Sequence, residues 1–207
     1  MGSPVVELAV GGCFAFATAA FPDDRGVFRS PFRAAAFGEA IGVPLFPVAQ
    51  VNYSVSRRGA VRGLHFTATP PGSAKYVYCP HGRALDIVVD LRVGSPTFGR
   101  YDSLLLDREH YPAMYLPVGV GHLFVSLEDG TVMNYLVSGD YQAEHELGIA
   151  PFDPELALPI PGDIEPILSP RDRDAPTLAQ VLAAGLLPDY TTCQRIEMAD
   201  RRTRGLR

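Results

Sequence analysis

The sequence lacks the features that mark membrane, secreted and zinc-stabilised proteins. Its three cysteines are far apart and form no Cys-x-x-Cys pair, which excludes a zinc knuckle or a thioredoxin-type motif. No apolar run approaches the roughly 18 residues of a membrane span. Residues 1–10 carry no basic side chain that would begin an export signal. We therefore expect a cytoplasmic protein with free thiols.

Lysine is almost absent, since Lys75 is the single lysine among 18 lysines and arginines. Arginine replaces lysine at most surface positions, but it cannot supply a compact ammonium group with an adjustable pKa. We therefore predict that Lys75 is functional. The formal net charge of -5 disfavours binding to nucleic acid, and we expect neither a nucleic-acid partner nor a membrane partner.

The composition indicates a folded chain with many turns. With 207 residues, of which 47% are hydrophobic, the chain is long enough for one domain with a substantial core. Its 20 glycines and 19 prolines favour frequent turns and short strands. From Pro47 to Tyr141 turns recur about every ten residues, which is typical of a β-sandwich or barrel.

Two patterns in this region predict particular strands. Leu85, Ile87, Val89 and Leu91 alternate with other residues, as in a half-buried strand. Asp129-Gly130 separates two apolar runs and predicts a hairpin between them.

Outside this region we expect short peripheral elements and one domain over residues 1–190. The expected elements are a strand pair or bent strand over Val5–Phe21, a loop over Phe21–Gly26, a helix from Phe32 to Ile41 ended by Gly42, a Pro-rich segment after Pro151, a helix over Thr177–Ala184 and a frayed, solvated tail over 191–207.

Two of the five histidines lie among glycines and apolar residues in the β region, namely His65 and His122. The others, His81, His110 and His145, lie in turn-like contexts and are interpreted as structural or surface residues. The turn Pro70-Pro71-Gly72 lies midway between His65 and Lys75, so a hairpin would place these two residues opposite each other. The ammonium would then keep the imidazole neutral, as a general base requires.

The run Leu116–His122 has the Pro-x-Gly-x-x-His spacing of the second cupin motif, typical of a double-stranded β-helix jelly roll. Metal-binding cupins also need a His-x-His pair and a Glu, but His65 is followed by Phe66-Thr67. A cupin without metal is therefore favoured over a metallo-oxygenase. Tyr135 is most simply a packing residue, and it gains interest only if its hydroxyl reaches the cavity of His65.

Eleven short runs, in order, resemble the dTDP-4-dehydrorhamnose 3,5-epimerase family and its relatives in antibiotic deoxysugar pathways. They are Phe21–Phe28, Val51–Ser54, Gly59–His65, Ala74–Val77, Asp86–Arg92, Gly94–Gly99, Leu116–His122, Asn134–Tyr135, Glu146–Ile149, Asp153–Pro154 and Leu168–Asp172. The resemblance spans about Phe21 to Leu187 and implies a mainly β cupin fold with a few short peripheral helices.

The resemblance also implies a reaction. Such enzymes are metal-free, cofactor-independent homodimers that invert C5, C3 or both in a dTDP-linked 4-keto-6-deoxyhexose, at carbons next to the keto group. By resemblance His65 is the catalytic base and Asp172 its carboxylate partner. Tyr135 returns the proton, and Lys75 lies near the keto oxygen.

The remaining site residues implied by the resemblance bind substrate. Three arginines would contact the diphosphate, which suits a guanidinium fork, namely Arg25, Arg62 and Arg171. The nucleotide or sugar would be lined by Phe28, Gln50, Asn52, Tyr141 and Glu146. His122 matches a pocket histidine that is structural or paired with Asp86.

Departures from the family pattern favour the antibiotic-sugar branch. Thr67 stands where Gln is usual, and the ending Gly185–Tyr190 resembles that branch. The tryptophans common in the family are also absent, which is a further departure. Whether C3, C5 or both are inverted stays open. Two alternatives also stay open: a ketoisomerase that moves the carbonyl from C4 to C3, and a non-catalytic cupin that binds a nucleotide sugar.

Overall fold

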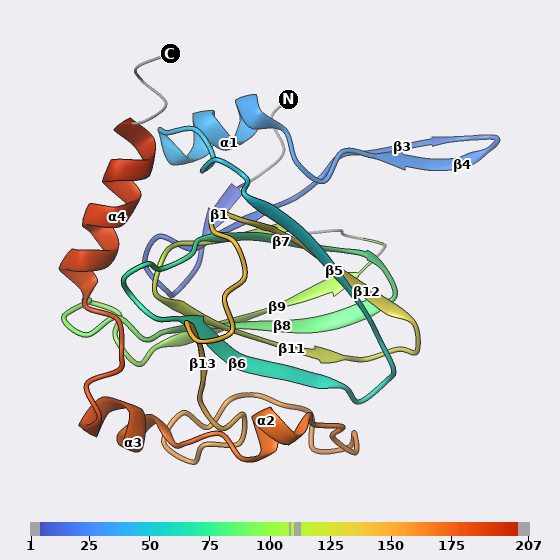
Figure 1. The fold of residues 1–207 in the computed structure, drawn as a ribbon. Coiled ribbons are helices and arrows are strands. Elements are labelled where there is room, and N and C mark those ends of the chain that lie inside the picture. The colour runs from blue at the N-terminus through green and yellow to red at the C-terminus, as the bar shows by residue number, and fades with distance from the viewer. Residues whose placement is uncertain (1–4, 108, 110–112, 203–207) are drawn as a thin grey trace.

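The computed structural model describes residues 5–107, 109 and 113–202, and eleven of its strands form two antiparallel sheets packed as a sandwich (Figure 1). The six-stranded sheet has the order β1 (Val5–Glu7), β2 (Phe14–Phe16), β10 (Ala113–Leu116), β7 (Lys75–His81), β12 (Thr131–Val137), β5 (Gln50–Ser56). The five-stranded sheet has the order β13 (Glu146–Gly148), β6 (Val61–Thr67), β11 (Val120–Ser126), β8 (Arg83–Asp90), β9 (Tyr101–Asp107).

The chain passes repeatedly between the two sheets. Strands β5 to β8 and β10 to β12 alternate between the layers, as in a jelly roll. The two predicted hairpins are therefore wrong: the turns at Pro70–Gly72 and Asp129–Gly130 join strands of different sheets. Residues that favour a tight turn specify a chain reversal, but they do not specify which layer receives the next strand.

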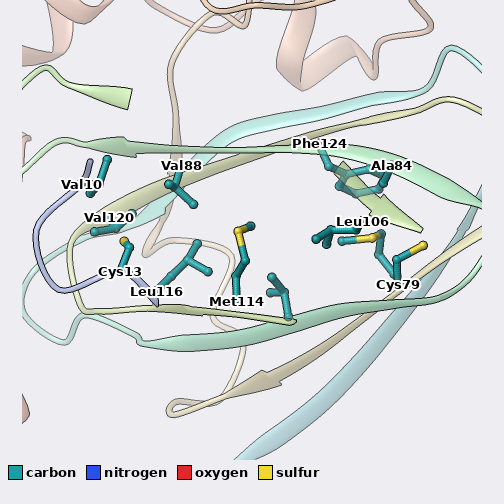
Figure 2. Close-up of a cluster of buried hydrophobic side chains, with 12 residues drawn as sticks. Val10, Cys13, Cys79, Ala84, Val88, Leu106, Met114, Leu116, Val120 and Phe124 are labelled. Atoms are coloured by element: carbon teal, nitrogen blue, oxygen red, sulfur yellow. The ribbon is translucent and has the colours of Figure 1, made fainter. Parts of the chain in front are cut away.

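One buried apolar core lies between the sheets, where side chains from both layers meet (Figure 2). Val88 and Phe124 come from the five-stranded sheet, while Cys79 and Met114 come from the six-stranded sheet. All four are at most 1% exposed.

Strand β8 is buried on both faces rather than half-buried, which corrects the prediction from its alternating pattern. Its second face packs against the C-terminal part of the chain, including Ile149, Leu156 and Val181. Figure 1 shows this part, with α2 (Pro170–Arg173) and α3 (Leu178–Ala183), beneath the five-stranded sheet. A strand covered on both faces contains apolar residues at successive positions, which weakens the period-two signal.

Several peripheral predictions are confirmed. β1 pairs with β2, and helix α1 (Ala34–Ile41) ends at Gly42, whose φ of 78° is left-handed. Helix α3 begins after Thr177 with a capping box to Gln180. The loop predicted over Phe21–Gly26 is instead part of a protruding ribbon formed by β3 (Ala20–Asp23) and β4 (Gly26–Arg29) (Figure 1). Both strands of this ribbon are largely exposed, so their residues do not show the alternation of apolar and polar side chains that predicts a strand.

The predicted frayed tail is wrong for residues 191–202, because helix α4 spans Tyr190–Arg202. Cys193 is buried at 1% exposure and Ile196 packs against the same apolar cluster on the outer face of the six-stranded sheet. The Arg92 guanidinium also lies 5.2 Å from the centre of the Tyr190 ring. No helix in the described part of the chain is both long and apolar enough to cross a membrane.

Candidate active site

A cavity of about 660 Å³ lies between the two sheets, within the size range of small-ligand sites. Ten of the residues singled out from the sequence line it: Asn52, Arg62, His65, Lys75, His122, Tyr135, Tyr141, Glu146, Arg171 and Asp172. The structure therefore brings together residues that lie more than a hundred positions apart, such as His65 and Asp172.

His65 lies on β6, two residues after Gly63 and opposite strand β11. His65 is the register partner of His122, and the pairing of β6 with β11 contains a register shift between His122 and Phe124. A Cβ on Gly63, whose φ is +127°, would lie 2.5 Å from the carbonyl oxygen of His122. Only glycine fits this approach, so Gly63 allows the two histidine-bearing strands to pair.

His65 and Asp172 form a hydrogen-bonded pair. The distance between His65 Nε2 and Asp172 Oδ1 is 2.5 Å, and Ser169 Oγ donates to Asp172 Oδ2 at 2.8 Å. Burial raises the pKa of Asp172, but the hydrogen bonds from His65 and Ser169 and the charge of Arg171 outweigh it, so the pKa lies below the usual value. An ionised Asp172 that accepts from Nε2 leaves Nδ1 as the basic nitrogen of the imidazole.

Lys75 faces the cavity from β7 on the opposite sheet. It is not the cross-strand neighbour of His65, which corrects the hairpin prediction. Burial lowers the pKa of Lys75, the charges of Glu146 and Asp86 raise it, and that of Arg171 lowers it further. Burial is the largest of these effects, and on balance the pKa of Lys75 lies below its ordinary value.

Tyr135 lies beside Lys75 on the adjacent strand β12, whose register pairs Val137 with Lys75. Burial and the charge of Asp86 raise the pKa of Tyr135, although the Ser54 hydroxyl and Arg62 act in the opposite direction. Tyr135 is therefore a neutral phenol at neutral pH and can donate a proton.

His122 is held by Asp86, as the sequence suggested. His122 Nε2 lies 2.8 Å from Asp86 Oδ1, and both side chains are buried. The His122 ring meets that of Tyr135 edge to face, with the centroids 6.0 Å apart. Burial raises the pKa of Asp86, while His122 and Lys75 oppose this shift.

Two arginines lie at the cavity with their guanidinium groups exposed. Arg62 Nε donates to Ser56 Oγ at 3.1 Å, and an Arg171 terminal nitrogen donates to the Glu146 carbonyl oxygen at 2.9 Å. Fixed and exposed guanidinium groups of this kind suit an anionic ligand.

Three residues singled out from the sequence do not line the cavity. Arg25 and Phe28 lie on the protruding β3–β4 ribbon, where Arg25 pairs with Asp23 at 2.6 Å and Phe28 is 66% exposed. The third, Gln50, bonds to two residues that do line it: its amide donates to Asn52 Oδ1 at 2.7 Å and its Oε1 accepts from the Tyr141 backbone at 2.8 Å.

Some cavity residues were missed by the sequence analysis. His145 lines the cavity, although it was interpreted as structural, while His81 is exposed at the end of β7. His110 lies outside the described residues. Thr67 donates to Glu146 Oε1 at 2.9 Å, a contact made by the pairing of β6 with β13. Ser169, which bonds to Asp172, could have been found from the Ser-x-x-Asp spacing typical of a helix N-terminus.

The two-sheet fold and the acid–base side chains in its cavity define a cupin-type protein. In the described part of the chain, no three His, Cys, Asp or Glu side chains are grouped so as to hold a metal ion. The family described as dTDP-4-dehydrorhamnose 3,5-epimerase matches residues 7–180, and the chain belongs to this family.

The names of its relatives differ in the number of sugar carbons that the enzyme epimerises. A dTDP-4-dehydrorhamnose 3-epimerase of Streptomyces niveus is 51% identical over 84% of this chain and 83% of its own length. A dTDP-4-dehydrorhamnose 3,5-epimerase of Streptomyces griseus is 47% identical over 90% and 92%. The crystal structure of ChmJ, a 3'-monoepimerase from Streptomyces bikiniensis in complex with dTDP-quinovose, is 46% identical, with a TM-score of 0.87 and coverage of 93% and 96%.

Proposed function

We propose that this protein epimerises a dTDP-linked 4-keto-6-deoxyhexose at C3, C5 or both, in the assembly of an antibiotic deoxysugar. The observation that carries the proposal is the placement of a His–Asp pair and a neutral tyrosine on facing sheets of one cavity. Inversion needs a base on one face of the sugar ring and an acid on the other, and this arrangement supplies both.

The reaction requires no redox change. The His65 imidazole takes the proton from the carbon next to the ketone, and the electrons of the broken C–H bond spread onto the keto oxygen as an enolate. Asp172 stabilises the imidazolium, and the Lys75 ammonium stabilises the developing charge on oxygen. Tyr135 then donates its proton to the opposite face of the same carbon, and the configuration is inverted. Proton exchange with solvent restores His65 and Tyr135.

The nucleotide would bind through the exposed guanidinium groups at the cavity. Arg62 and Arg171 suit the oxygens of a diphosphate. Asn52 and Tyr141, both held by Gln50, would line the nucleotide or sugar beside Glu146. His122 would complete the sugar pocket next to Tyr135.

Two further residues that are expected to bind substrate support a homodimer. Arg25 and Phe28 match substrate-binding positions, yet they lie on a ribbon that protrudes from the fold (Figure 1). We infer that this ribbon reaches the cavity of a second copy. The edge strand β5 supports association, because Val51, Tyr53 and Val55 are exposed large apolar side chains on one face of it.

A cytoplasmic location is part of the proposal and is supported by the three cysteines. All three are free and buried. Burial raises the pKa of Cys193 to about 11 and that of Cys79 to about 12, so their thiols stay protonated and unreactive. Such thiols are compatible with a reducing compartment.

A deuterium-exchange experiment tests the function. The protein is mixed with dTDP-4-keto-6-deoxyglucose in heavy water, and the loss of the H3 and H5 signals is followed by NMR. We expect exchange at one or both positions, and a loss of about 10²–10⁴-fold in His65→Ala and Asp172→Asn. Tyr135→Phe should slow inversion more than proton removal. Full exchange in His65→Ala would contradict the assigned base, and dTDP binding without exchange in the wild type would favour a non-catalytic role.

A further inference from the structure

The Asp172 carboxylate reaches the cavity from outside the two sheets. It lies on the four-residue helix α2, seven positions after Glu165, near the end of residues 165–172, which we call the strap. The strap residues that line the cavity are Ile167, Leu168, Ser169, Arg171 and Asp172. Because Asp172 must stay within hydrogen-bond distance of His65 on β6, its position depends on how the strap is held against the sheet.

The strap is attached at the turn between β5 and β6. The Ile167 backbone N–H donates to the Gly59 carbonyl oxygen at 2.8 Å, and the Val61 N–H donates to the Ile167 carbonyl oxygen at 3.1 Å. These two bonds form an isolated parallel bridge between Ala60 and Ile167. The strap therefore runs beside the start of β6, and it meets His65 four residues further along that strand.

Gly59 makes this attachment possible. Gly59 is buried, and its φ of +87° is a left-handed conformation that favours glycine. A Cβ on Gly59 would lie 2.5 Å from the Glu165 carbonyl oxygen and 3.4 Å from the Ile164 Cγ2. The first contact is with backbone and cannot be relieved by the rotation of a side chain. An alanine at this position would therefore push the strap away from the turn.

The strap is too stiff to absorb this displacement near Glu165. Pro166 follows Glu165 directly and Pro170 begins α2. Each proline fixes its own φ and restricts the residue before it. Ser169 Oγ accepts from the Asp172 N–H at 3.1 Å and donates to Asp172 Oδ2 at 2.8 Å. A shift at Glu165 is therefore carried along the strap to the Asp172 carboxylate.

We propose that Gly59 is a positioning residue of the epimerase, which places Asp172 beside His65 by allowing the strap to lie against the β5–β6 turn. The proposal rests on the proposed function, because it concerns the His–Asp pair to which that function assigns proton abstraction. Gly59 lies outside the cavity lining, so its effect on the reaction passes through the strap.

The contact between His65 and Asp172 can be followed without substrate. A carboxylate that accepts from Nε2 holds the neutral imidazole in its Nε2–H tautomer. In protein labelled with ¹⁵N in histidine, the difference between the shifts of the two ring nitrogens reports the tautomer. The spectrum is recorded at mildly alkaline pH, where an unperturbed imidazole is neutral. His122, whose Nε2 lies 2.8 Å from Asp86 Oδ1, serves as the internal reference.

In Gly59→Ala we expect His65 to lose its fixed tautomer, as it does in Asp172→Ala, while His122 keeps its own. The deuterium-exchange rate should fall by about 10²-fold, as a displacement of roughly 1 Å in an active site can cause. Gly94→Ala is the matched control, because its φ is also +87° and nothing lies within 4 Å of its Cβ. This control should keep both tautomers and the wild-type rate.

Pro166→Gly tests the stiffness of the strap and covers the case in which Gly59→Ala does not fold. Pro166 is exposed, so its replacement leaves the core intact. A glycine adds backbone freedom between the attached end of the strap and Asp172. We expect a His65 tautomer mixture and an exchange rate that lie between those of the wild type and Asp172→Ala.

The proposal is overturned if folded Gly59→Ala keeps the fixed tautomer of His65, whatever happens to the rate. If Gly59→Ala does not fold, an unchanged His65 tautomer in Pro166→Gly overturns it. It is also overturned if Gly94→Ala changes the His65 tautomer as much, since strain from a positive φ would then be sufficient. The spectra need no substrate, so a wild type that fails to exchange deuterium would overturn the proposed function and leave the tautomer result readable.

Discussion

At the scale of single residues, the proposed chemistry depends on hydrogen bonds that hold charged groups in one protonation state. Asp172 accepts from His65 and from Ser169, and its side chain is only 6% exposed. A carboxylate held in this way stays ionised and fixes the orientation of the imidazole. The same residue therefore has a part in the proposed chemistry and in stability, and its contribution to stability depends on pH.

The lowered pKa of Asp172 predicts a pH-dependent contribution to the free energy of unfolding. A carboxyl group whose pKa is lower in the folded state stabilises the fold above its unfolded pKa of about 3.9, and this contribution is lost as pH falls through the folded pKa. The difference in unfolding free energy between wild type and Asp172→Asn should be largest near neutral pH and shrink in acid. Urea unfolding at several pH values measures it, and a difference independent of pH would contradict the assignment.

At the scale of elements, the site depends on how closely strands β6 and β11 approach each other. His65 and His122 are register partners on these strands, and Gly63 is the residue at which a side chain would collide with the β11 backbone. Strand β11 also pairs along its whole length with β8, whereas β6, and β13 beside it, join the sheet through the pairing of β6 with β11. Gly63 thus connects the packing of the sheet to the position of His65, the proposed base.

Gly63→Ala tests this connection. The added Cβ meets backbone atoms and the positive φ strains an alanine, so we expect a loss of stability of about 1–3 kcal/mol together with a loss of exchange activity. Chemical denaturation and the exchange assay measure the two effects. Gly26→Ala is a matched control for stability, because its φ is +129° and nothing lies within 4 Å of its Cβ. Equal losses of stability in the two variants would contradict the interpretation that Gly63 is needed for the close approach of β6 to β11.

At the scale of the whole molecule, one chain does not bring together every residue of the proposed site. The cavity holds His65, Lys75, Tyr135 and Asp172, whereas Arg25 and Phe28 lie on the ribbon. If the ribbon completes the cavity of a second copy, an active site contains residues from two chains, and defects on different chains can complement each other.

Mixed dimers of His65→Ala and Arg25→Ala test this arrangement. Each variant alone should be impaired, but in a mixed dimer the chain with Arg25→Ala contributes an intact His65 and its partner contributes an intact ribbon. One of the two sites is then complete, and exchange activity should return on co-expression with two different affinity tags. No recovery in a purified mixed dimer would mean that Arg25 acts within its own chain or not at all. Sedimentation measures the dimer itself.

Much of the site could be predicted from the sequence because its chemistry lies in short motifs. His65, Lys75, Tyr135 and Asp172 each stand in a run that resembles the family, and all four line one cavity. The bond between His122 and Asp86 was also anticipated and is present at 2.8 Å. His145 was missed because a polar, turn-like context does not reveal that a residue lines a cavity.

The local elements could be predicted from the sequence alone: the helix ended by Gly42, the helix after Thr177 and the many short strands separated by turns. These follow from backbone preferences of neighbouring residues. Two features became visible only in the folded chain: Pro70–Gly72 and Asp129–Gly130 cross between sheets, and Lys75 faces the cavity from the opposite layer to His65. Strand pairing depends on contacts between distant residues and on burial of both faces of a sheet, and neither is encoded within one turn.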